Sequence, residues 1–280
     1  ILDPIFIFEL DSFGGIGFGL GIAGAAMATV ISQVVVFFVF IIMLFFKDHS
    51  YISFNLNDFT FSTEILWDII KVGLPASLSM IVMAVGQGVF NKILVHISVE
   101  TVAAYQVAGR LDMLVFLPIF SIAASLTTLI GMFYGAKEFE ALRFTIRYGI
   151  ISALIITIFS SALVYIFADQ VVRFFTEDES IVLIAVNFLQ IFAFAYPFIA
   201  VGITTGRVLQ GLGKGLPVLV ITIVRVLGVS APLALFFVFI MEKSVEWVWY
   251  SMMLSTVVAF AIELTWLVST IKKLPVKKSD

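Results

Sequence analysis

Long stretches without a charged residue constrain this sequence more than any other feature. A helix that crosses a lipid bilayer needs ~20 consecutive, mostly apolar residues. Five charge-free runs reach that length, at residues 12–46, 72–91, 113–136, 148–168 and 180–206. Two more runs, at residues 212–240 and 245–271, hold two charged residues each. The sequence therefore predicts an all-α integral membrane protein with seven spanning helices, and residues 1–8 are the expected end of an eighth.

The composition excludes several other classes of protein. Hydrophobic residues make up 61% of the 280 residues and charged residues 12%, whereas a soluble domain is about half apolar and about a quarter charged. The formal net charge of -3 and the absence of a dense basic stripe outside the C-terminal tail argue against a nucleic-acid partner. The sequence has no Cys, and its two histidines, His49 and His96, are far apart. We therefore expect no enzyme activity, no cofactor and no metal site.

Basic residues are distributed unevenly between the two sets of predicted loops. One set holds eleven: Lys47, Lys71, Lys137, Arg143, Arg147, Arg207, Lys214, Lys272, Lys273, Lys277 and Lys278. The other set holds two, Arg173 and Lys243, together with several acidic residues. Because positively charged loops remain on the cytoplasmic side, we expect a multi-pass plasma-membrane protein with a cytoplasmic C-terminus.

One long polar connection divides the chain. Residues 47–67 form the expected cytoplasmic linker between residues 1–46 and residues 68–280, and the latter hold six predicted helices. Gly73-Leu74-Pro75 and Gly215-Leu216-Pro217 form a weak internal repeat, and each is placed to open a helix, because Pro suits a first helical turn.

Polar residues inside the predicted helices are the candidates for function. Three pairs each share one helix face: Gln87 with Asn91, Gln106 with Arg110, and Asn187 with Gln190. Such pairs either hold helices together or line a wet cavity, and both roles remain open. We therefore consider all six residues candidates for a substrate cavity.

Charged residues inside the membrane are costly and are often functional. Arg110 and Asp112 point to different helix faces, so each either ties its helix to a neighbour or takes part in transport. The same alternatives hold for Arg225, and Glu263 faces either the helix bundle or the inner interface. For Arg110 we expect an interior position with an acceptor partner.

Several segments resemble the multidrug and toxic compound extrusion (MATE) family. Residues 21–33, GIAGAAMATVISQ, follow Leu2-Asp3-Pro4 and resemble the fifth-to-sixth helix region of that family. Further likenesses follow in the family's order at residues 72–78, 103–110, 116–118 and 208–213. The resemblance implies twelve helices in two lobes, of which this chain holds the end of helix five, helix six and the complete second lobe. An N-terminal part with the first four helices is then expected to be missing.

The resemblance also implies a function. It predicts a secondary active antiporter that exports amphipathic drugs or metabolites, cationic compounds among them, in exchange for protons or sodium, and that is a monomer at full length. The better match is the DNA-damage-inducible-type and archaeal branch, in which Asp3 would carry the coupling ion with the help of Thr29. Positions where another branch holds sodium-binding acids fall near Met83 and Ile199, which are apolar.

Two other functions remain as alternatives. A flippase for lipid-linked precursors would need a strongly cationic central cavity, and only Arg110 and Arg225 are available for it in the second lobe. The other alternative is a non-transporting membrane subunit, and vesicle uptake with an imposed gradient would separate an exporter from it.

Overall fold

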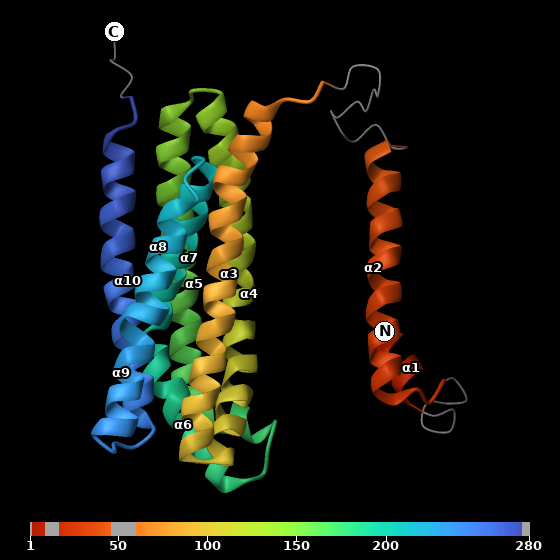
Figure 1. Ribbon diagram of the computed structural model, residues 1–280, viewed down its shortest axis with the longest axis vertical. Coiled ribbons are helices and arrows are strands. Elements are labelled where there is room, and N and C mark those ends of the chain that lie inside the picture. Colours follow the sequence, from red (N-terminus) through yellow and green to blue (C-terminus); the bar gives the residue numbers. More distant parts are fainter. Residues whose placement is uncertain (1, 9–16, 46–59, 276–280) are drawn as a thin grey trace. The chain divides into compact units, whose positions relative to one another are not determined.

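The computed structural model describes residues 2–8, 17–45 and 60–275. Every regular element among these residues is a helix, which confirms the all-α membrane fold (Figure 1). The chain forms two compact units, Ile1–Phe61 and Ser62–Asp280, which we call the first unit and the second unit. Most of the predicted linker, residues 47–59, lies outside the described residues.

The first unit is built from α1 (Leu2–Ile7) and α2 (Gly21–Phe45). Residues 17–20 run back along α1, where the backbone N–H groups of Phe18 and Leu20 donate to the carbonyl oxygens of Ile5 and Phe6 at 2.9 and 3.0 Å. Gly24 allows α2 to approach α1, since a Cβ atom there would lie 2.2 Å from the carbonyl oxygen of Phe6.

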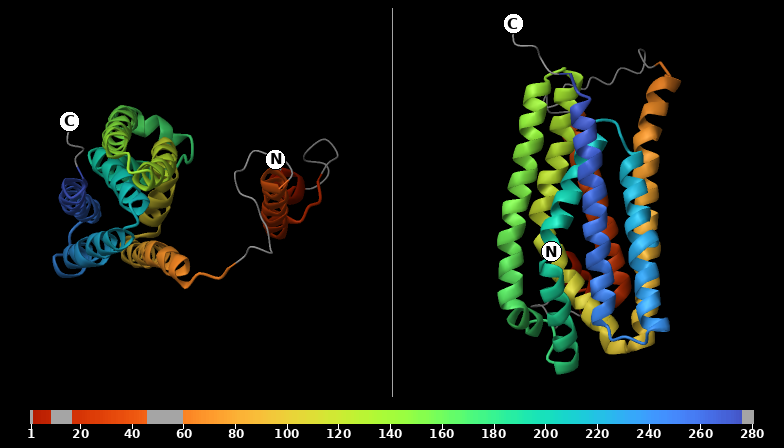
Figure 2. Two further views of the ribbon diagram at one scale, coloured as in Figure 1. Left: turned by 90° about the horizontal axis from the view of Figure 1, so that it is seen from above. Right: turned by 90° about the vertical axis from the view of Figure 1, so that its left-hand side faces the viewer.

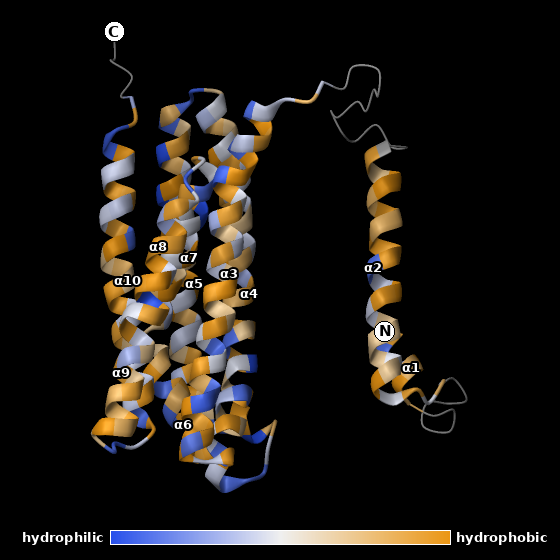
Figure 3. Cartoon of the chain, in the orientation of Figure 1, coloured by the Kyte–Doolittle hydropathy of each residue, from blue (hydrophilic) through white to orange (hydrophobic). Residues whose placement is uncertain are grey.

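The second unit contains the remaining helices. They are α3 (Thr63–Ile97), α4 (Val99–Gly135), α5 (Phe139–Arg173), α6 (Glu179–Ala193), α7 (Tyr196–Gly211), α8 (Leu216–Ile223), α9 (Ala231–Leu235) and α10 (Glu246–Lys272). Viewed along their axes they stand side by side, and apolar residues cover most of their length (Figures 2 and 3). Among the described residues six helices are long and apolar enough to cross a membrane, and the bent pair α6–α7 makes a possible seventh. This agrees with the seven predicted spans.

Several helices extend well beyond the apolar runs that predicted them. α3 begins at Thr63, where the Ser62 hydroxyl accepts a hydrogen bond from the backbone N–H of Ile65. Pro75 therefore lies inside α3 and does not open it, contrary to the prediction from the Gly-Leu-Pro repeat. The reason is that residues 63–71, which mix charged and apolar side chains, continue the helix outward from the charge-free segment. The two repeats nevertheless lie close together. A Cβ atom on Gly215 would lie 2.6 Å from the carbonyl oxygen of Val72, the residue directly before the first repeat.

The span that begins with α8 is irregular. Two π-helical segments, η3 (Val224–Ser230) and η4 (Phe236–Ile240), flank the short helix α9. In η3 the backbone N–H of Ala231 donates to the carbonyl of Val226, five residues back, and Pro232 follows with no N–H to donate. π-Helical turns are rare and frequently occur at functional sites. This one carries Arg225.

Helix packing encloses both the core and a hollow in the second unit. α4 packs against α5, α6 and α7, around a core in which Trp249 and Tyr196 are fully buried. α10 packs against α7 and η3, while α3 packs against α8. These contacts bring α3, α7, η3 and α10 around a common space.

Candidate functional site

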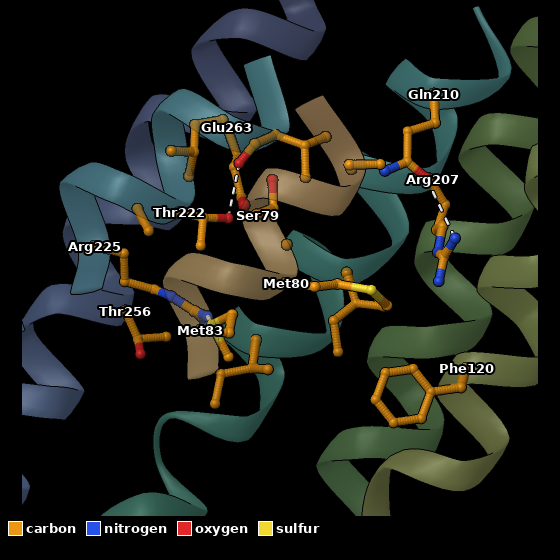
Figure 4. Close-up of a pocket in the computed structure, with 18 of the residues that line it drawn as sticks. Ser79, Met80, Met83, Phe120, Arg207, Gln210, Thr222, Arg225, Thr256 and Glu263 are labelled. Carbon is orange, nitrogen blue, oxygen red and sulfur yellow. Dashed lines mark hydrogen bonds between the residues drawn. The ribbon is translucent and has the colours of Figure 1, made fainter. Parts of the chain in front are cut away.

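A cavity of about 590 Å³ lies among α3, α7, α8, η3 and α10, and we call it the main cavity. Its walls are largely apolar and include Met80, Met83, Phe120, Phe198 and Ile203. Charged or amide side chains enter it at Arg207, Gln210, Arg225 and Glu263 (Figure 4). Mostly apolar walls with a few polar groups are typical of binding sites for small molecules, and the volume lies within their usual range of roughly 300–1,000 Å³.

Arg225 brings a positive charge into the main cavity from η3. Its side chain is partly buried and extends from η3 toward α3, where one guanidinium nitrogen donates to the sulfur of Met83 at 3.0 Å (Figure 4). A thioether is only a weak acceptor. Within the described part of the chain, no carboxylate comes within ion-pair distance of this guanidinium. A charge in this setting is costly, and the cost falls when an anionic group pairs with it.

Glu263 brings a negative charge to the same cavity from α10. Gly202 of α7 makes room for its carboxylate, since a Cβ atom on Gly202 would lie 2.4 Å from Glu263 Oε2. No hydrogen bond or ion pair joins this carboxylate to another residue within the described ranges 2–8, 17–45 and 60–275. The main cavity therefore contains charges of both signs that are not paired with each other.

Arg207 and Gln210 lie at another part of the cavity wall (Figure 4). The Arg207 guanidinium donates to Gln210 Oε1 at 3.3 Å, and both residues lie on the last turns of α7. The sequence placed Arg207 in a loop, but α7 continues to Gly211, so that position is corrected. The helix extends because Val208 and Leu209 are buried against neighbouring helices.

A second polar contact lies where the α6–α7 span breaks. The two helices meet at an angle of 59°, and Tyr196 is the first residue of α7. The Tyr196 hydroxyl donates a hydrogen bond to the carboxylate of Asp112 on α4. Asp112 is thus tied to a neighbouring helix, which is one of the two roles that the sequence left open for it.

The residues predicted to form a substrate cavity are dispersed in the second unit. Gln106 Nε2 donates to Asn91 Oδ1 at 3.5 Å and so connects α4 with α3. Gln87 lines a smaller cavity of about 170 Å³, which shares Met83, Ile199 and Arg225 with the main cavity. None of the six predicted residues lines the main cavity. Their role in substrate binding remains a prediction.

The other predicted residues of this set have different surroundings. Arg110 is exposed on α4, and the acceptor partner expected for it is not found among the described residues. Asn187 and Gln190 are partly buried on α6, and the side-chain oxygen Oδ1 of Asn187 is buried without a hydrogen-bond partner in the described part of the structure. Helical spacing placed each pair on one face correctly, but it does not tell which face meets the cavity.

The predicted coupling residues belong to the first unit. Asp3 is exposed in the first turn of α1, and the Thr29 hydroxyl donates to the carbonyl of Ala25 at 3.0 Å within α2. No hydrogen bond between these two side chains occurs in the described ranges. Their coupling role stays a prediction.

The main cavity includes residues that the sequence reasoning did not select. Arg225 and Glu263 were recognised as charges inside spans but not placed in a common site, whereas Arg207, Gln210 and Gly202 were missed. The spacing of Arg207 and Gln210, three residues apart on one helix face, is a signal that could have identified that pair. Met83 and Ile199, the apolar residues at the positions expected for sodium-binding acids, both line the cavity beside Arg225.

Comparisons with known proteins give a consistent result. A family model described as MatE matches residues 75–236. The probable multidrug resistance protein NorM of Thermotoga maritima is 26% identical over 266 residues, which is 95% of this chain and 57% of that protein. The multidrug export protein MepA of Staphylococcus aureus is 30% identical over 215 residues, or 77% of this chain and 46% of that protein.

A solved structure shares the fold as well as the sequence pattern. It is that of a MOP superfamily transporter from Pyrococcus furiosus, which is 33% identical and has a TM-score of 0.88 over 99% of this chain and 60% of that chain. The present chain spans about half the length of the curated relatives it matches.

Proposed function

The chain belongs to the MATE family of transporters, and from this premise we propose that the protein is a secondary active antiporter that exports amphipathic drugs or metabolites. The main cavity is the observation that carries this proposal. It combines an apolar lining with unpaired charges on different helices, and it lies among spans that include a bent pair and π-helical turns. Broken and irregular spans are typical of transporters that alternate between two states.

We propose that an ion gradient, of protons or of sodium, drives export. The sequence contains no phosphate-binding P-loop, which a chain that hydrolyses ATP would need. Asp3 is the proposed coupling acid and Thr29 its helper. Acidic residues within membrane segments often belong to ion pathways.

The proposed setting is the plasma membrane, with the C-terminus in the cytoplasm and the full-length protein as a monomer. The excess of basic residues in one set of loops supports this orientation. Neither an enzyme activity nor a cofactor forms part of the proposal.

The test is export by the full-length protein reconstituted in vesicles. An imposed proton or sodium gradient should drive movement of a fluorescent lipophilic compound, and Asp3→Asn should reduce it to the rate measured without a gradient. Asp68→Asn is the matched control, because Asp68 is exposed on α3 and does not line the main cavity. Both variants should be as abundant and as stable as the wild type.

Two results would count against the proposal. If Asp3→Asn exports normally, the coupling role belongs to other residues of the protein. If a gradient drives no export but a lipid-linked precursor crosses the vesicle membrane, the flippase alternative is favoured over the antiporter.

A further inference from the structure

We propose that the main cavity binds its ligand through an anionic group, which the guanidinium of Arg225 holds, while the apolar walls receive the body of an amphipathic compound. This inference rests on the proposed function, because it names the substrate class of the same cavity. The anionic group is a carboxylate, sulfonate or phosphate.

The charges of the cavity favour an anion. Its lining includes two guanidinium groups, of Arg225 and Arg207, and one carboxylate, of Glu263. Arg207 already donates to Gln210, whereas the contact recorded for Arg225 is the weakly accepting sulfur of Met83. Arg225 thus keeps guanidinium donors available for a stronger acceptor. A planar guanidinium can hold a carboxylate or phosphate through two parallel hydrogen bonds.

Glu263 does not serve as that acceptor. Its carboxylate rests against Gly202 of α7, and it forms no ion pair with Arg225 in the part of the chain that the structure describes. The two groups reach the cavity from different helices, α10 and η3. Glu263 therefore leaves the guanidinium donors of Arg225 free, and its single negative charge is outnumbered by the two guanidinium groups of the lining.

Three of the hydroxyl groups that line the cavity do not compete with Arg225 as donors. Each of three hydroxyls donates its proton to a backbone carbonyl one turn earlier in its own helix: Ser79 to Pro75 at 2.8 Å, Thr222 to Val218 at 2.7 Å and Thr256 to Met252 at 3.0 Å. Because a hydroxyl has one proton, these groups offer only lone pairs to the cavity. Among these groups and Arg225, the guanidinium of Arg225 is the charged donor, and its own contact is only with a thioether.

The remaining walls suit an aromatic or aliphatic body. Met80, Met83, Phe120 and Phe198 line the cavity. Methionine side chains adapt to ligands of different shape and make favourable contacts with aromatic rings. The apolar lining therefore discriminates little between ligands of different shape. The charge of the ligand's head group then determines which compounds bind.

The experiment measures binding to the full-length protein in detergent by equilibrium dialysis. Three radiolabelled probes share one naphthyl group and differ in charge: 2-naphthoxyacetate, its neutral amide and the corresponding trimethylammonium compound. We expect 2-naphthoxyacetate to bind most tightly. Arg225→Gln should weaken its binding roughly tenfold or more, the loss that follows from removing a hydrogen bond to a charged group. Arg225→Lys, which keeps the charge, should weaken it less.

The matched control is Arg147→Gln, which removes an exposed arginine of α5 that does not line the main cavity. It should bind all three probes like the wild type, and thermal unfolding should show that every variant is folded. If the trimethylammonium probe binds best, or if Arg225→Gln leaves carboxylate binding unchanged, the inference is wrong. If Arg225→Gln does not fold, two measurements still test the inference. They are the binding of the anionic probe to Arg225→Lys and the order in which the wild type binds the three probes.

Two further measurements complete the test. One distinguishes a lipid head group from a free anionic compound as the ligand, and the other distinguishes the anion site from the proposed export function. Competition by phosphatidic acid in mixed micelles with the detergent, stronger than by unlabelled 2-naphthoxyacetate, would assign the site to a lipid head group. The binding assay needs no gradient, so its outcome is independent of export. If the anionic probe binds through Arg225 but no gradient drives export, the proposed function fails and the anion site stands.

Discussion

At the scale of single residues, the hydrogen bond between Tyr196 and Asp112 is a polar contact between helices that a single substitution removes. It joins α7, at the break of the bent span, to α4 in a part-buried setting. Tyr196→Phe removes the donor and leaves the carboxylate without that partner, which should lower the free energy of unfolding by ~1–3 kcal/mol. Tyr250→Phe is the control, because Tyr250 is 43% exposed and its hydroxyl makes no hydrogen bond in the described residues. Equal thermal stability of the two variants in detergent would show that the bond contributes little.

At the scale of elements, two glycines of α7 separate packing from function. A Cβ atom on Gly211 would lie 2.8 Å from the carbonyl oxygen of Thr127, whereas on Gly202 it would lie 2.4 Å from the flexible end of Glu263. A backbone cannot move aside as a carboxylate can, so Gly211→Ala should cost ~1–3 kcal/mol of stability and Gly202→Ala much less. Helix propensity favours alanine more at Gly202, in the interior of α7, than at Gly211, its last residue. That difference is at most ~1 kcal/mol, and it adds to the difference in packing.

The second half of that prediction concerns transport. Gly202→Ala should displace Glu263 in the main cavity and so lower export while the protein stays folded, because the charge pattern of the cavity changes. Thermal unfolding and vesicle export measured on both variants test this. Normal export by Gly202→Ala would show that the position of Glu263 is not critical.

At the scale of the whole molecule, the helices of the second unit place their connections alternately at two ends. Residues 136–138 and 212–215 lie at the same end as the C-terminus of α10, and residues 174–178 and 241–245 lie at the other (Figure 1). The basic-residue asymmetry predicts that the first end is cytoplasmic. Because the sequence has no Cys, single cysteines can report on each side.

The topology prediction uses Glu177→Cys and Lys273→Cys in intact cells. Glu177 is preferred to the neighbouring Asp178, whose carboxylate accepts hydrogen bonds at the start of α6 from the Ser180 hydroxyl and from backbone N–H groups. These bonds hold the pKa of Asp178 below its usual range. An impermeant thiol reagent should label position 177 from outside and position 273 only after lysis. The reverse pattern would invert the proposed orientation.

The sequence by itself determined the class of fold and the number of spans. A helix satisfies its backbone hydrogen bonds within one segment, so the length and polarity of each apolar run decide whether that run crosses a membrane. The ends of α3 and α7 were less predictable, because turns that mix charged and apolar residues, such as those from Thr63 to Lys71, continue a helix beyond the charge-free run.

Only the tertiary structure decided which polar residues meet. Arg225 and Glu263 were visible as charges within spans, but their common cavity depends on how η3, α10, α7 and α3 pack. Arg225 also lies in the π-helical turn of η3, and a period of 3.6 residues does not describe such a turn. A site assembled from several helices that are separated in sequence is a property of their packing, and it cannot be predicted from any one helix alone.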